Sequence, residues 1–231
     1  YDTVVLYVFM NNPTTQTYTS LTTAYDFFNG ELFDSGLPPC LITMQRHKGT
    51  FGYFSGERFA NTTNLKEVTD EIALNPVHFA NREPIEVLAT LVHEMVHLWQ
   101  HHNGKPPRKG YHDKQWGGKM REIGLIPTAT GEPGGKETGQ KMTHLIEENG
   151  HFAHAATKLL VERPAILYHD RSSEHDTTRK KKAASKTKYT CPECGLNAWA
   201  KPDALLVCGN CKKLLEAENV EEEVIATNDR K

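Results

Sequence analysis

The spacing of apolar and polar residues predicts a strand followed by a helix near the start of the sequence. Residues 3–9 are mostly apolar and β-branched, which is typical of a strand. Apolar side chains then recur every three or four positions over residues 21–32, and this spacing predicts a helix. Ser20 is suited to cap the start of this helix, and Gly36 is expected to lie beyond its end.

Three further short segments have the composition of β-strands. Residues 41–46 and 51–54 flank a glycine-containing turn at 48–50, so we expect them to pair as a β-hairpin. Residues 72–75 form another apolar run, which Pro76 closes. The strand at 51–54 is expected either to contribute aromatic side chains to the core or to lie at a sheet edge, where an extended peptide would pair with it.

The strongest helical pattern in the chain covers residues 85–102. Apolar residues fit a helical period there, and Gly104 follows as a stop signal. A second helix is predicted over residues 113–123, with Trp116 and Met120 as packing residues on one side.

Beyond the second helix the pattern is weaker. Residues 126–139 are rich in glycine, threonine and proline and predict a loop. Residues 143–160 predict a helix interrupted at Gly150, and residues 164–168 predict a strand. Together the predicted elements indicate an α+β fold of helices with a small antiparallel sheet.

The composition predicts a globular protein with one main domain. The chain has 231 residues, of which 38% are hydrophobic and 24% charged, and this is enough to bury a core. The net charge of −2 gives no overall attraction to nucleic acid or membranes, and no apolar run approaches the roughly 18 residues of a membrane-spanning helix. Paired cysteines favour metal binding in a reducing compartment, and we expect a cytoplasmic protein.

Changes in composition divide the chain into four expected parts. Residues 1–168 carry the predicted strands and helices and are expected to form the main domain. Residues 169–188 become polar and then basic, with six positive charges and no acid in the last ten residues, and predict a linker. Residues 189–216 contain the paired cysteines, and residues 217–231 are expected to form an acidic, solvated tail.

The predicted helix at residues 85–102 contains the pattern His-Glu-x-x-His as His93, Glu94 and His97. Residues four apart share one face of a helix, so the two imidazoles can be presented to a single ion. Catalytic zinc usually has three protein ligands and a water, from which Glu94 is placed to take a proton. The pattern therefore predicts a catalytic zinc site, against the alternative of two histidines on an ordinary polar helix face.

A third ligand has to come from outside these two helical turns. His101 continues the same face, but a straight helix places it about 12 Å from His93, too far to share one ion. His112 follows the turn after the helix and directly precedes the next one, so it can fold back over the pair and is the better candidate. A glutamate from a later helix, Glu122 or Glu147, is the alternative.

Several other polar residues have weaker signals. Tyr111 and Arg121 are candidates to stabilise an oxyanion, with little in the sequence to favour either. The histidines at positions 144, 151 and 154 are suggestively spaced, but we interpret them as surface or core residues and not as a second metal site.

Two Cys-x-x-Cys knuckles near the end of the chain are separated by thirteen residues. The four cysteines are Cys191, Cys194, Cys208 and Cys211. Four thiolates complete a tetrahedral zinc shell without an open position, so the predicted site is structural. The intervening residues predict a β-hairpin of 197–201 with 204–207, and a module this small depends on its metal for folding energy.

These motifs resemble the SprT-like zinc metalloprotease family, which includes Spartan-related proteins. The matching residues are His93-Glu94-x-x-His97, Gly110-Tyr111-His112, Trp116 and, more loosely, segments between residues 27 and 54. The resemblance covers roughly residues 18–170 and implies a zincin-like fold in which the three histidines bind a catalytic zinc ion and Glu94 is the catalytic base. The cysteine module resembles the zinc ribbon that follows this domain in bacterial members.

The resemblance implies a zinc-dependent endopeptidase that hydrolyses peptide bonds with a Glu-activated, zinc-bound water. Because Spartan-type members digest proteins trapped on DNA, it also implies a protein substrate and DNA as a partner, contacted through residues 179–188 and the ribbon. The alternative is a non-catalytic DNA-binding or adaptor protein with two structural zinc sites. An open coordination position beside Glu94 favours the enzyme, and a fourth protein ligand favours the adaptor.

Overall fold

The computed structural model describes residues 12–162, 168–171 and 186–217. The chain divides into two compact units, Tyr1–Asp176 and Thr177–Lys231, and each is described by itself. The predicted strand at 3–9 lies outside the described residues, as do most of the predicted 164–168 strand, most of the predicted linker and nearly all of the predicted acidic tail. The first unit mixes helices with small sheets, which confirms the predicted α+β class.

Helix α2 (Pro13–Phe33) begins earlier than the sequence pattern predicts. The side chain of Asn12 accepts the backbone N–H groups of Thr14 and Thr15, and Pro13 occupies the first helical position, where its missing N–H costs nothing. The prediction that Ser20 caps the helix is therefore wrong. The buried face of α2 carries the predicted apolar residues into the core.

Three strands form the larger sheet of this unit: β1 (Leu41–Met44), β2 (Gly52–Ala60) and β3 (Val68–Leu74), in the order β1-β3-β2. The predicted hairpin between β1 and β2 is wrong because β3 lies between them, parallel to β1 and antiparallel to β2. The sheet is consequently mixed and not purely antiparallel. Ile72, Ala73 and Leu74 are buried, which suits a central strand, and β2 lies at a sheet edge.

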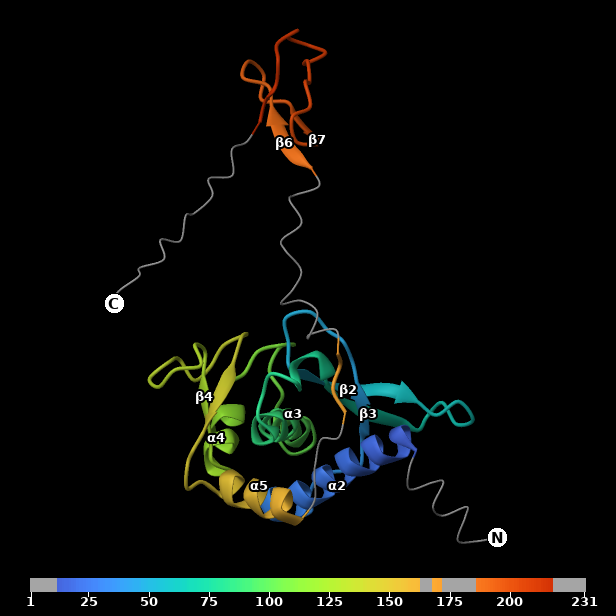
Figure 1. Ribbon diagram of the computed structural model, residues 1–231. Coiled ribbons are helices and arrows are strands. Elements are labelled where there is room, and N and C mark those ends of the chain that lie inside the picture. Colours follow the sequence, from blue (N-terminus) through green and yellow to red (C-terminus); the bar gives the residue numbers. More distant parts are fainter. Residues whose placement is uncertain (1–11, 163–167, 172–185, 218–231) are drawn as a thin grey trace, which may run out of the picture. The chain divides into compact units, whose positions relative to one another are not determined.

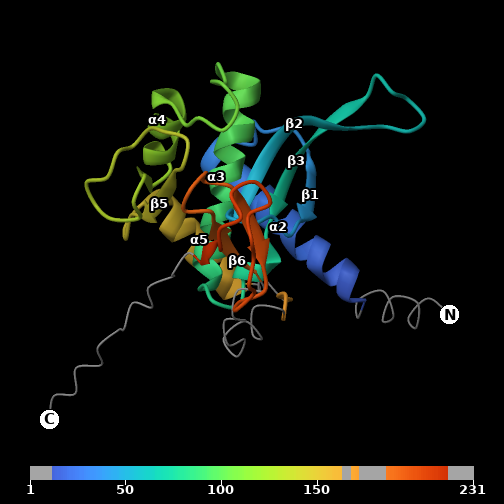
Figure 2. The same ribbon diagram turned by 90° about the horizontal axis from the view of Figure 1, so that it is seen from above.

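Helix α3 (Pro84–Asn103) runs through the middle of the unit, between the sheet and the remaining helices (Figure 1). A capping box between Glu83 and Glu86 marks the start of the helix, and Gly104 caps its end. This confirms the predicted helix at 85–102. The short 3₁₀ helix η1 (Pro76–His78) and a loop connect β3 to α3. Helices α2 and α5 pack against α3, which is buried over most of its length (Figure 2).

After α3 the chain forms helix α4 (Lys114–Glu122), a two-stranded sheet and helix α5 (His151–Glu162). Asp113 caps α4, which confirms that helix. Two predictions in this region are partly wrong, because β4 (Leu125–Thr128) occupies the start of the predicted loop and β5 (Thr143–Ile146) the start of the predicted helix. The two strands pair with each other in antiparallel register, so each is stabilised by a partner that is distant in sequence.

The second unit is a small three-stranded sheet with β6 (Thr187–Thr190) in the centre, flanked by β7 (Asn197–Ala200) and β8 (Glu216–Ala217). The predicted hairpin between residues 197–201 and 204–207 is wrong, because β7 pairs with β6 instead. Val207 forms an isolated bridge with Leu214. None of the helices in the described ranges is both long enough and apolar enough to cross a membrane.

Candidate metal centres

Helix α3 presents His93 and His97 on one face, one helical turn apart, with ring centroids 5.3 Å from each other. The helix is held rigidly because apolar neighbours on both sides of these residues, such as Val92 and Val96, are fully buried. His93 itself is buried, and His97 is partly buried. The pattern of apolar residues that forms α3 therefore also fixes the direction of both imidazoles.

His112 reaches the same place from the loop between α3 and α4. Its backbone forms an isolated bridge with Gly139, in which the two residues exchange N–H···O bonds of 2.7 and 3.0 Å. The Nδ1 atom of His112 also lies 3.1 Å from the Gly139 carbonyl oxygen. A carbonyl can only accept, so Nδ1 carries the proton and Nε2 of the neutral ring is left with a free lone pair.

Three imidazole nitrogens converge at this point. His112 Nε2 lies 3.0 Å from His97 Nε2 and 3.3 Å from His93 Nε2. Zinc–nitrogen bonds of about 2.0–2.1 Å in tetrahedral geometry separate neighbouring nitrogens by roughly 3.3 Å, so the spacing fits one zinc ion. Burial lowers the pKa of His93, His97 and His112, which keeps the rings neutral and able to act as ligands.

Among the described residues, the side chains that could hold an ion here are these three histidines. Of the two alternative ligands, Glu122 instead forms an ion pair with Lys119, at 2.7 Å between nitrogen and oxygen. Neither Glu122 nor Glu147 belongs to the group. His101 lies instead beside His102 and Asp70, as the helical spacing requires.

Glu94 follows His93 on α3, is buried, and faces the edge strand β2. The backbone N–H of Phe54 donates to its carboxylate. Position 52 requires glycine because a Cβ there would lie only 2.8 Å from the carbonyl oxygen of Ala73, while Glu94 Oε1 would be 3.4 Å from it, an ordinary contact distance. Burial raises the pKa of Glu94 to about 8, so the carboxyl group is able to take up and release a proton near neutral pH.

Trp116 on α4 packs against all three imidazoles. Its ring centroid lies 4.8 Å from that of His93, 5.3 Å from that of His97 and 4.4 Å from that of His112. The side chain is fully buried, as is Met120, which confirms both as packing residues. Within the described structure, the indole Nε1 of Trp116 is buried without a hydrogen-bond partner.

His144 on β5 is a site residue that the sequence analysis missed. Its Nδ1 lies 3.1 Å from Nδ1 of His93, on the opposite side of the His93 ring from the converging nitrogens. Burial, with a smaller effect of Arg82, lowers the pKa of His144 to about 4. Nothing in the local spacing identifies this contact, because it depends on the pairing of β5 with β4.

Among the described residues, the remaining candidates do not belong to the group of converging side chains. His151 and His154 are exposed, which confirms their predicted surface position. Arg121 forms an exposed ion pair with Glu137 on the other side of α4 from the buried Trp116. Tyr111 lies under the guanidinium of Arg108, with 5.2 Å between the guanidinium carbon and the ring centroid.

The second unit brings its four cysteines together. The ligand atoms of Cys191, Cys194, Cys208 and Cys211 all lie within 4.8 Å of one another, and all four are free thiols. The sulfur atoms of Cys194 and Cys208 are 3.6 Å apart, far longer than a disulfide bond and close to the roughly 3.8 Å expected around a tetrahedral zinc ion. The backbone N–H of Cys211 helps to lower the pKa of Cys208 to about 7, which favours the thiolate.

Comparisons with known proteins cover the part of the chain that contains the first of these centres. The model of the SprT-like family matches residues 21–135, a range that includes α3, Glu94 and all three converging histidines. A relative from Salmonella typhimurium with the name "Uncharacterized protein in mucB 3'region" is 60% identical over 50 residues, which is 22% of this chain and 68% of the relative. Strand β5 with His144, and the cysteine unit, lie beyond the part matched by the family model.

Proposed function

The chain belongs to the SprT-like family, and from that premise we propose that it is a zinc-dependent endopeptidase with a zincin-like catalytic domain. The observation that carries this proposal is the convergence of the Nε2 atoms of His93, His97 and His112 on a helix that also carries the buried carboxyl group of Glu94, next in sequence to His93. Three protein ligands are the number found in catalytic zinc sites, which keep the fourth position for water.

In this proposal zinc, when bound, supplies a Lewis acid and lowers the pKa of its water toward about 7. Glu94 is the general base that takes the proton of the attacking water and later gives it to the leaving amine. The N–H of Phe54 holds the carboxylate in place, and the carbonyl of Gly139 fixes the orientation of His112. The surrounding apolar residues of α3 exclude bulk water from the buried side of the site.

The edge strand β2 is the element on which we propose that the substrate binds. It pairs with β3 on one side only, and its first residues lie against Glu94. An extended peptide that pairs with the free side of β2 would therefore pass close to the catalytic base.

The cysteine unit is proposed to hold a second, structural zinc ion. Four thiolates fill all tetrahedral positions and leave none for water. Its buried core is small, consisting chiefly of Tyr189, Leu215 and two of the cysteines, so metal binding would contribute much of its folding energy. The expected total is one catalytic and one structural zinc ion per chain.

DNA is proposed as a partner that brings the peptidase to DNA-associated proteins. The support is the charge of residues 179–188, which carry six positive charges without an acid and would neutralise backbone phosphates. The runner-up function, a non-catalytic DNA-binding adaptor, requires a closed metal site. It is less favoured because the histidine group has three members among the described residues, which leaves a coordination position open.

Metal removal provides the direct test of this function. The full chain is expected to cleave denatured casein, to lose that activity after dialysis against a chelator and to recover it when one to two equivalents of zinc are returned. The assay is run with and without duplex DNA, since a DNA requirement would appear as activity only in the arm that contains DNA. A zinc-loaded protein that cleaves nothing in either arm would favour the adaptor.

Replacement of His144 by alanine is expected to weaken zinc binding at the histidine site by about 10-fold to 100-fold, because the residue that orients a metal-ligating imidazole tunes its affinity. The Nδ1–H of His93 would lose its acceptor 3.1 Å away. Zinc affinity is measured by competition with a chromogenic chelator, and the exposed His154→Ala protein serves as the matched control. Unchanged affinity in the His144→Ala protein would contradict the orienting role.

A further inference from the structure

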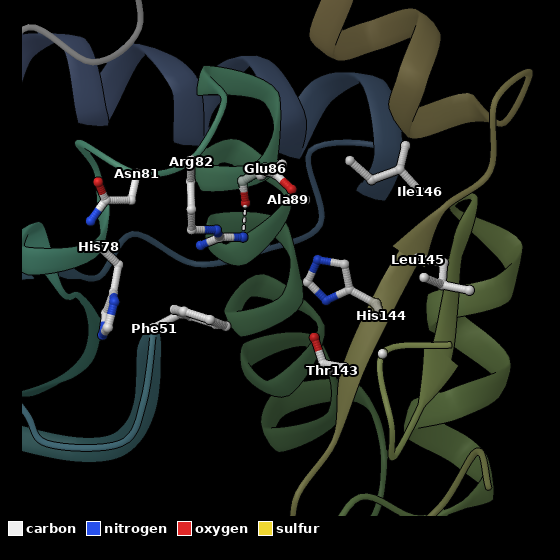
Figure 3. A pocket seen from close by; sticks show the side chains of 11 residues that line it. Phe51, His78, Asn81, Arg82, Glu86, Ala89, Thr143, His144, Leu145 and Ile146 are labelled. Atoms are coloured by element: carbon white, nitrogen blue, oxygen red, sulfur yellow. Dashed lines mark hydrogen bonds between the residues drawn. The ribbon is translucent and has the colours of Figure 1, made fainter. Parts of the chain in front are cut away.

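A pocket of about 650 Å³ lies beside the histidine site in the first unit (Figure 3). Glu86 and Ala89 of α3 line one side, Phe51 stands at the start of β2, and residues 143–146 of β5 line the opposite side. His78 and Asn81, from the segment between β3 and α3, lie at the end farthest from β5 in the view, and Arg82 lies between them and His144.

The pocket adjoins the proposed catalytic residues through His144. The ring of His144 lines it while touching His93 from behind, at 3.1 Å between the two Nδ1 atoms. Ala89 lies four residues before His93 on α3, which is about 6 Å along the helix axis. Phe51 directly precedes Gly52, which lies against Glu94. A peptide that follows β2 advances about 3.3 Å per residue, so a side chain within about two residues of the scissile bond would enter the pocket.

Arg82 is held in the pocket by neutral partners. Its guanidinium donates to Thr90 Oγ1 at 2.9 Å and to the backbone oxygen of Glu86 at 2.6 Å. It also lies over the Phe51 ring, 4.4 Å from the centroid. These contacts use two of its five N–H donors and fix the plane of the group, so further donors are available in a preset orientation.

Burial lowers the pKa of Arg82, and the charge of Glu86 partly offsets this effect without forming an ion pair. Over the described part of the chain, the ion pairs within 4 Å do not include Arg82. Glu86 also lines the pocket, but its carboxylate accepts the N–H of Glu83 at the start of α3, where the helix dipole favours it. Neither of the lining histidines, His78 and His144, can neutralise Arg82, because an imidazole is either neutral or cationic. The partly buried cation is therefore left to pair with an anion from outside.

We propose that this pocket is a substrate subsite that binds a carboxylate of the peptide, within about two residues of the scissile bond, through Arg82. The inference rests on the proposed peptidase function and names the chemistry of its substrate. The carboxylate comes either from an acidic side chain or from the carboxyl terminus of a peptide. Phe51, Leu145 and Ile146 would contact the apolar part of the bound residue.

The test measures binding separately from cleavage, using full-length Glu94→Gln protein loaded with zinc. The probes are nine-residue alanine-rich peptides with a fluorescent label, one set with a single glutamate at each position in turn and a matched set with glutamine. Each peptide is made with a free and with an amidated carboxyl terminus, so that the two sources of the carboxylate are distinguished.

We expect peptides with glutamate at one position, or with a free terminus at one length, to bind about 10-fold to 100-fold more tightly than their neutral counterparts. Adding Arg82→Gln should remove this preference, Arg82→Lys should retain part of it, and Arg46→Gln, a change at an exposed arginine outside the pocket, should leave it intact. Zinc content and thermal unfolding confirm that the variants are folded.

If the Glu94→Gln protein, which retains Arg82, binds acidic and neutral peptides with equal affinity, the subsite proposal is overturned. This holds whether or not the wild-type protein cleaves those peptides. Acid-selective binding that depends on Arg82, without cleavage of any probe or of casein by wild-type protein, supports the subsite and removes the peptidase function. Cleavage of both peptide sets by the wild type with equal kcat/KM supports the peptidase function and removes the subsite. The two proposals therefore fail separately.

Discussion

Replacing Glu94 by glutamine is expected to lower kcat/KM for peptide hydrolysis by about 10²- to 10⁴-fold, the range that general acid–base groups contribute. Glutamine has nearly the same shape and can occupy the same space beside Gly52, but its amide cannot take the proton of the attacking water. The three histidines are unchanged, so zinc content should remain at about two ions per chain. Activity is measured on casein and on a peptide that the wild type cleaves.

The control for this substitution is Glu162→Gln, which removes an exposed carboxylate at the end of α5, away from the histidines. It should retain wild-type kcat/KM and zinc content. Equal activity of the Glu94→Gln and wild-type proteins would show that Glu94 is not the base, even with both metals in place.

The second large effect is expected from His112→Ala, which should reduce bound zinc from about two ions per chain to about one. The substitution removes one of the three converging nitrogens, while the backbone bridge to Gly139 does not depend on the side chain. The cysteine site should keep its ion. Elemental analysis after gel filtration gives the count, and circular dichroism checks the fold.

Two controls separate a ligand from a merely nearby residue. His151→Ala removes an exposed histidine, and Glu122→Gln removes the carboxylate that sequence reasoning left as the alternative ligand. Both should keep two zinc ions. If the His112→Ala protein keeps two ions as well, the third ligand has been assigned to the wrong residue.

The sequence was sufficient to predict α3 and its histidine pair because both depend on local spacing alone. A run of apolar residues with a glycine stop defines the helix, and a separation of four places His93 and His97 on one face. His112 could also be predicted from the sequence, because its neighbour Asp113 caps α4 and so marks where the chain turns back. The chemistry of the first centre is thus carried by short-range signals.

The errors concern partners that are distant in sequence. Strand β1 was expected to pair with β2, but β3 pairs with both and takes the central position, where its Ile72, Ala73 and Leu74 are buried. Strands β4 and β5 have only four residues each and are stabilised by each other, so periodicity could not reveal them. His144 was missed for the same reason, since its contact with His93 exists only once β5 is in place.

The position of Trp116 has a practical consequence. Its indole is shielded from solvent and touches all three imidazoles, whereas Trp199 in the cysteine unit is largely exposed. Trp99 on α3 is also packed against the core, so we would replace it with phenylalanine to let the blue-shifted emission report on Trp116 alone. In that protein a paramagnetic ion such as Co²⁺, bound by the three histidines, would quench the emission. The protein contains an intrinsic optical probe of its own metal occupancy, readable without label, substrate or chelator.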